Sequence, residues 1–65
     1  MMDGVHMLTR SELALRWRIS KSWLDKQMII APETLPAFVT IGRQTRFPIQ
    51  EVIRWENERI SRLTN

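Results

Sequence analysis

Residues 8–28, LTRSELALRWRISKSWLDKQM, contain the starts of two short helices with only a brief turn between them. Thr9 and Glu12 have the spacing of a capping box, in which each side chain accepts a hydrogen bond from the other residue's backbone N–H. Ser20 is a second N-cap residue, and apolar residues flank both caps at the spacing of a hydrophobic staple. Two helices joined by so short a turn must cross steeply, as in a helix-turn-helix. The predicted helices are Arg10–Arg18 and Lys21–Met28.

The chain after the second helix changes from helix-breaking to strand-forming residues. Pro32 and Pro36 exclude continued helix and favour an extended or turning path. The runs at 38–41 and 45–47 are rich in β-branched and aromatic residues, and residues 42–44 between them begin with glycine, which takes the positive φ of a tight turn without steric cost. This pattern predicts a two-stranded hairpin.

A third helix follows the hairpin. Pro48 ends the second strand and pre-sets φ for a helix start, after which apolar residues recur at helical spacing over Ile49–Arg62. Sixty-five residues suffice for one small domain. The predicted fold class is mainly α with a small β-hairpin, a winged helix-turn-helix over residues 8–62, with a flexible tail at 1–7 and a frayed C-terminus at 63–65.

The composition argues against catalysis and metal binding. There is no cysteine, and the single histidine, His6, falls in the predicted tail, so a serine or cysteine triad and a thiolate zinc site cannot be built. The glutamates of the third helix stand beside arginines, which predicts an ion-paired surface. No apolar run approaches the roughly 20 residues of a membrane span. We expect no enzyme activity, no cofactor, no metal and a cytoplasmic location.

The positive charge is concentrated in the middle of the chain. The net charge is +3, yet residues 16–46 hold six Lys and Arg against two acidic residues, a net charge of +4. Such a distribution favours a polyanionic partner such as nucleic acid.

The second helix carries the side chains that a DNA-reading helix needs. An α-helix fits the major groove of B-DNA, and Lys21, Ser22 and Lys26 project from the outer face after the Ser20 cap. Asp25 has two interpretations: it accepts from a cytosine N4 amine, or it pairs with a neighbouring lysine within the helix. We favour the ion pair.

Arginines at the hairpin and at the end of the first helix are further candidates for DNA contact. Arg43 and Gln44 lie at the predicted hairpin tip and Arg46 one strand residue further on, where they can reach a minor groove or the DNA backbone. The alternative is that these arginines keep a sheet edge soluble, and that the Arg46 stem packs over a tryptophan. For Arg16 and Arg18, phosphate contact and a favourable interaction with the helix dipole are equally good interpretations.

The three tryptophans are predicted to be mainly structural. In a domain this short of core volume, we expect Trp17 and Trp55 in the core. Trp23 lies on the flank of the second helix, where it either caps the core or lies against a deoxyribose. Binding of single-stranded nucleic acid would require exposed tryptophans.

The order of these motifs resembles the small winged helix-turn-helix proteins of the excisionase and AlpA-like prophage-regulator group, which are related to the DNA-binding domain of MerR-type regulators. The segments that carry the resemblance are LTRSELA (8–14), ISKSWL (19–24), PAFVTIG (36–42) and RFPIQEVIRW (46–55). The resemblance covers about residues 7–60 and implies that the second helix enters the major groove while the wing contacts the adjacent minor groove or backbone. It implies a DNA-binding protein of a bacterial mobile element, acting on the nucleoid as an excisionase that bends attachment-site DNA or as a transcription regulator.

The chain departs from that group at three positions. Arg18 stands where the group usually has a turn glycine, Gln27 replaces a frequent tryptophan, and Thr40 replaces a common basic residue. Because the long C-terminal coiled coil of MerR-type regulators is missing, we expect a monomer that binds repeated sites side by side.

The expected partners are double-stranded DNA, an integrase and neighbouring copies of the chain. The alternative function is a protein-interaction module that docks an integrase or repressor through the apolar stripe of the third helix. That stripe is Val52, Ile53, Trp55 and Ile60.

Overall fold

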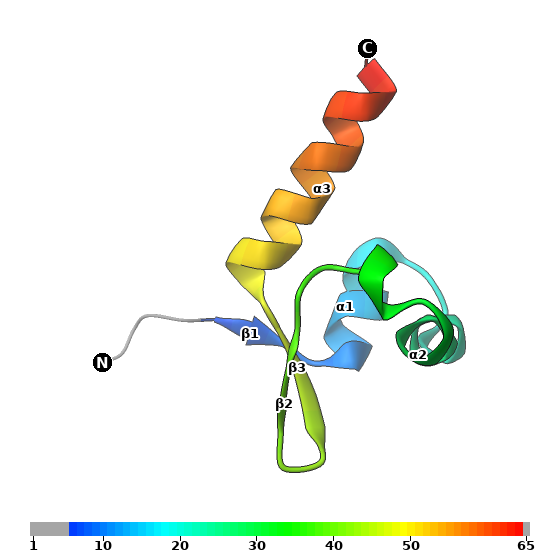
Figure 1. Ribbon diagram of the computed structural model, residues 1–65, viewed down its shortest axis with the longest axis vertical. Coiled ribbons are helices and arrows are strands. Elements are labelled where there is room, and N and C mark those ends of the chain that lie inside the picture. Colours follow the sequence, from blue (N-terminus) through cyan, green and yellow to red (C-terminus); the bar gives the residue numbers. More distant parts are fainter. Residues whose placement is uncertain (1–5, 65) are drawn as a thin grey trace.

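The part of the chain that the structure describes, residues 6–64 of a computed structural model, is mostly helical (Figure 1). Within that range there are three α-helices and one three-stranded antiparallel sheet with the strand order β1-β3-β2. The elements in chain order are β1 (Met7–Leu8), α1 (Arg10–Trp17), α2 (Lys21–Ile30), the 3-10 helix η1 (Pro32–Thr34), β2 (Val39–Ile41), β3 (Gln44–Pro48) and α3 (Ile49–Thr64).

Helix α1 begins at the predicted capping box and ends in an unusual backbone conformation. The Thr9 N–H donates to Glu12 Oε1 at 2.8 Å, and the Glu12 N–H donates to Thr9 Oγ1 at 3.1 Å. Arg18, predicted as the last helical residue, is instead the C-cap, with φ 60° and ψ 44°. This left-handed conformation turns the chain directly into the Ser20 cap of α2.

Helix α2 is longer than the sequence indicated. The Ser20 Oγ accepts from the Trp23 N–H at 3.0 Å, as predicted, but the helix continues to Ile30 rather than ending at Met28. It ends where Pro32 disfavours helical φ and ψ at the preceding residue, since Ala31 has φ −151°. Pro32 therefore ends α2 at Ile30, two residues later than predicted. Pro32 itself lies in the first turn of η1, where a missing N–H is tolerated.

The sheet has one strand more than the predicted hairpin. Met7 pairs with Pro48 and Leu8 with Phe47, and the Ile49 N–H donates to the His6 carbonyl at 2.9 Å. Met7 thus lies in a strand and the His6 carbonyl accepts a hydrogen bond, at positions that the prediction places in a flexible tail over residues 1–7. Residues 1–5 lie outside the described residues. Pairing with β1 satisfies backbone groups on the side of β3 that faces away from β2. The sequence did not indicate this strand, because two residues are too few to show a periodic pattern.

The hairpin has a tighter turn than predicted. Ile41 pairs with Gln44, so the loop is only Gly42 and Arg43 rather than residues 42–44. Gly42 has φ 63°, and Arg43 does not share this positive φ. A positive φ confined to the first loop residue is the pattern of a type II′ turn, which places glycine there.

The core takes one or two side chains from each of β1, α1, α2, β3 and α3. The start of α3 packs on β3, and the rest of the helix projects away from the hairpin and reaches Thr64, two residues past the predicted end (Figure 1). Helical residues 63–64 thus differ from the frayed C-terminus expected there, and residue 65 lies outside the described range. Within the described residues no helix combines the length and apolar character that a membrane span requires. The core cluster of the described residues consists of Leu8, Leu13, Ala14, Leu24, Leu35, Phe47 and Val52, and Pro36 is fully buried as well.

Candidate nucleic-acid interface

A polar hollow of about 380 Å³ lies between the start of α1, the start of α2 and the hairpin. Of the described residues that line it, four are cationic and none is acidic. A concave surface lined by one sign of charge concentrates the electrostatic field and attracts the opposite charge, here an anion. We call this surface the basic hollow; its lining residues are Thr9, Arg10, Ser11, Lys21, Arg43, Gln44, Thr45 and Arg46.

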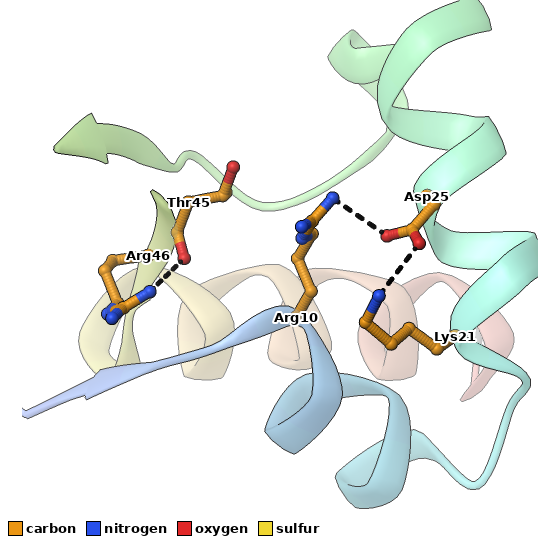
Figure 2. A network of polar contacts seen from close by, with 5 residues as sticks. All are labelled: Arg10, Lys21, Asp25, Thr45 and Arg46. Atoms are coloured by element: carbon orange, nitrogen blue, oxygen red, sulfur yellow. Dashed lines mark hydrogen bonds and ion pairs between the residues drawn. The ribbon is translucent and has the colours of Figure 1, made fainter. Parts of the chain in front are cut away.

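Asp25 joins the two cations on the helical side of the basic hollow (Figure 2). Its Oδ2 is 3.1 Å from Lys21 Nζ, one helical turn away on α2, and its Oδ1 is 3.2 Å from Arg10 Nη1 at the start of α1. The ion pair predicted for Asp25 is thereby confirmed with Lys21. The second partner comes from a different helix, and no motif in the sequence indicated it.

The hairpin supplies the other side of the basic hollow. Arg43 lies at the exposed turn. Arg46 donates to the Thr45 carbonyl at 2.9 Å (Figure 2), and it also donates to the Gln44 side-chain oxygen. These bonds hold the Arg46 guanidinium along β3. The arginine that lies over a tryptophan ring in the described part of the chain is Arg59, over Trp55.

Ser20, Ser22 and Lys26, the remaining candidates of the second helix, do not line the basic hollow. The Ser20 hydroxyl is occupied as the helix cap, while Ser22 and Lys26 are exposed one turn apart on α2. The basic hollow thus brings together Lys21, Arg43, Gln44 and Arg46 from the predicted set. Ser22 and Lys26, on the outer face of α2, lie outside the basic hollow.

Arg16 and Arg18 lie outside the basic hollow and have different surroundings. The Arg16 guanidinium donates from Nε and Nη2 to the two oxygens of Glu56 on α3, at 2.8 and 2.9 Å. This bond lowers the pKa of Glu56 from its ordinary value and raises the pKa of Arg16. Arg16 is therefore held by an ion pair with another helix, a contact that neither interpretation included, whereas Arg18 is exposed at the turn.

Sequence analysis missed Arg10 and its neighbours at the start of α1. From the sequence, Thr9 is a helix cap and Arg10 is the first residue of the predicted helix, yet both line the basic hollow together with Ser11. They reach it because α1 and α2 cross steeply and place the first turn of α1 near that of α2. The only available signal was a cationic residue directly after an N-cap, which is common in surface helices.

The tryptophans gather on a second, apolar groove of about 600 Å³ between the α1–α2 turn, η1 and α3. Trp17 and Trp55 stack with ring centroids 4.6 Å apart and are only half-buried. The prediction that both lie in the core is wrong: Trp17 packs against the core from outside, and Trp55 stacks on Trp17. The Trp17 indole N–H donates to Glu56 Oε2, and the Trp55 indole N–H donates to the Thr34 carbonyl. Trp23 is 48% exposed. The apolar side chains of this groove are Trp17, Ile19, Trp23, Leu35, Trp55 and Ile60.

Trp55 also contacts a cation, on the face of its ring. Arg59, one turn along α3, places its guanidinium carbon 4.4 Å from the ring centroid and donates to the Thr34 carbonyl. Trp17 and Trp55 are thus committed to contacts within the protein. Stacking on single-stranded bases would be left to Trp23.

Within the described residues, no three His, Asp or Glu side chains are placed to hold a metal ion. Comparisons of the chain with protein-family models, with curated proteins and with solved structures give no match. The function is therefore argued from the geometry of the basic hollow and the groove.

Proposed function

We propose that the protein is a winged helix-turn-helix protein that binds double-stranded DNA through the basic hollow. In this arrangement α2 enters the major groove, the β2–β3 hairpin lies on the adjacent minor groove, and the chain performs no chemistry of its own. The observation that carries the proposal is that Lys21 of α2 and Arg43 of the hairpin, 22 positions apart in the sequence, line one concave surface together with Arg10.

The shape of duplex DNA explains why such a hollow is useful. Neighbouring grooves are separated by a single sugar-phosphate strand, so a protein that reaches into both must accommodate that strand between its two projecting elements. Cations and hydroxyl groups are the partners that phosphate oxygens take in protein–DNA complexes. The basic hollow offers both, with Thr9, Ser11 and Thr45 as the hydroxyl donors.

Two biological roles fit this mode of binding: an excisionase that bends attachment-site DNA, and a transcription regulator of a bacterial mobile element. DNA bending distinguishes them, because an excisionase acts by changing the path of the duplex. Footprinting on the attachment and promoter regions of the element, with bending measured in parallel, would assign the role.

The test of DNA binding is a titration of a labelled mixed-sequence duplex of about 20 base pairs at about 50 to 200 mM salt. Each phosphate contact contributes about 0.9 to the slope of log affinity against log salt, which corresponds to about eightfold in affinity at about 0.1 M salt. We expect Lys21→Ala and Arg43→Ala each to reduce the slope and the affinity by about these amounts.

Arg54→Ala is the matched control, because it removes the same charge from α3, where Arg54 pairs with Glu51 away from the basic hollow. It should leave the slope unchanged. An affinity independent of salt, or equal losses in all three variants, would contradict DNA binding through the basic hollow.

Protein docking through α3 is the second candidate function. It is favoured by the apolar groove and by Ile53 and Ile60 of α3, which are 43% and 56% exposed. The groove shares no lining residue with the basic hollow, so both functions can coexist. Ile60→Ser should weaken binding of an integrase or repressor from the same element and leave duplex binding unchanged; the reverse pattern would contradict this role.

A further inference from the structure

We propose that Asp25 limits the sequence-independent affinity of the basic hollow for the DNA backbone. Its carboxylate holds the side chains of Arg10 and Lys21 and cancels one of their two charges. This inference rests on the proposed DNA binding and assigns a second role to the same site: restraint of its electrostatic attraction.

The geometry shows which oxygen of Asp25 does what. Oδ2 pairs with Lys21 Nζ at 3.1 Å. Oδ1 is buried and accepts no hydrogen bond of good geometry, although Arg10 Nη1 is only 3.2 Å away, so this contact is an ion pair rather than a directed hydrogen bond. With one oxygen buried and the other occupied, the carboxylate is poorly placed to accept from a cytosine amine. Its role lies in the ion pairs.

The position of Asp25 determines its effect on an approaching phosphate. Asp25 does not itself line the basic hollow but lies behind Arg10 and Lys21, both of which do. Its negative charge therefore opposes the binding of any DNA phosphate, whatever the base sequence. It also restrains two long side chains that could otherwise follow a phosphate in many registers.

Restraint of this kind matters because sequence-independent binding is almost entirely electrostatic. In a genome, about 10⁶ or more non-specific sites compete with the target site for a DNA-binding protein. Excess affinity for the DNA backbone therefore keeps the protein away from its target. Specificity is a difference between affinities, and a charge that weakens the wrong complex contributes to it.

The fold does not depend on these ion pairs. The side chains of Arg10, Lys21 and Asp25 are 39%, 47% and 34% exposed, and ion pairs this exposed contribute little to stability. The core contact of this turn of α2 is made by Leu24, which is fully buried and is not changed in the variant. The isosteric variant Asp25→Asn should therefore fold.

The experiment compares wild-type protein, Asp25→Asn and Glu58→Gln on the labelled mixed-sequence duplex described above. Glu58→Gln makes the same charge change on the exposed surface of α3, outside the basic hollow. We expect Asp25→Asn to bind about eightfold more tightly at about 0.1 M salt, with a slope steeper by about 0.9, and Glu58→Gln to match wild type.

The double variant Lys21→Met/Asp25→Asn separates charge from structure. It removes one charge of each sign, so we expect its slope to return to the wild-type value, with folding checked by circular dichroism. If wild type binds duplex DNA and Asp25→Asn binds equally or more weakly with an unchanged slope, the role of Asp25 is refuted. If wild type does not bind duplex DNA at about 50 mM salt, the proposed function itself fails.

Discussion

Arg18 takes on a backbone conformation that L-residues with a Cβ rarely adopt. Among the described residues it is the one non-glycine residue with a positive φ, and it ends α1 at φ 60°. Its backbone N–H donates to the carbonyls of Ala14 and Leu15, so the left-handed turn closes the helix end. The steric cost of that conformation is about 1 kcal/mol for a residue with a Cβ.

Replacement of this residue by glycine should therefore stabilise the fold. We expect Arg18→Gly to raise the free energy of unfolding by about 0.5 kcal/mol, because relief of strain exceeds the added entropy of the unfolded chain. Urea unfolding monitored by circular dichroism measures the change. Arg18→Ala keeps the strain and removes the charge, so it serves as the control; if it proved as stable as Arg18→Gly, strain would not be the cause.

At the scale of elements, α1 and α3 are joined outside the core by a polar and aromatic clamp. Arg16 and the Trp17 indole N–H both donate to the Glu56 carboxylate, and Trp17 stacks on Trp55 beside it. The hydrogen bond from Arg16 is the main reason that the pKa of Glu56 lies below its ordinary value of 4.5, and the hydrogen bond from Trp17 lowers it further. The clamp joins the end of α1 to the middle of α3.

The clamp should make stability depend on acid pH. A carboxylate whose pKa is lower in the folded state contributes stability that is present above its unfolded pKa, about 4.5, and is lost as pH falls through the folded pKa. We expect Glu56→Gln to be less stable than wild type by about 0.5–1 kcal/mol at neutral pH and to lose less stability on acidification.

Urea midpoints of the two proteins between about pH 7 and pH 3 would measure this difference. Glu33→Gln, which removes an exposed carboxylate from η1, is the control and should follow wild type. Parallel pH curves for wild type and Glu56→Gln would show that the clamp does not contribute.

Across the whole molecule, the β2–β3 hairpin and α3 extend in opposite directions, while α1 and α2 lie to one side between them (Figure 1). The molecule measures 38 Å roughly along α3 and 30 Å across it (Figure 1), equivalent to about 11 and about 9 base pairs at about 3.4 Å per pair. One molecule therefore has the size to contact about one turn of duplex.

Two measurements follow from this size and charge. We expect hydroxyl-radical footprinting to show protection over about one helical turn for each bound molecule. The slope of log affinity against log salt should lie between about −2.7 and −3.6, because Asp25 offsets one of the four cations of the basic hollow and Lys26 beside it can add one. Protection over several turns by a single molecule would contradict this arrangement.

The sequence by itself determined the elements whose signals are local. The caps at Thr9 and Ser20 join residues three apart, Pro48 acts on its own backbone, and Gly42 meets a requirement of its own turn. Such signals predicted three helices and a hairpin in the right order. They also predicted the Lys21–Asp25 pair, since residues four apart on a helix are neighbours.

The tertiary structure alone decided the contacts between distant residues. Arg10 meets Asp25 only because α1 and α2 cross, and Arg16 meets Glu56 across 40 positions. The strand at Met7–Leu8 exists because β3 offers it a partner. The basic hollow belongs to this second class: its cations come from three elements, and their convergence depends on crossing angles and strand register, which no local pattern of residues specifies.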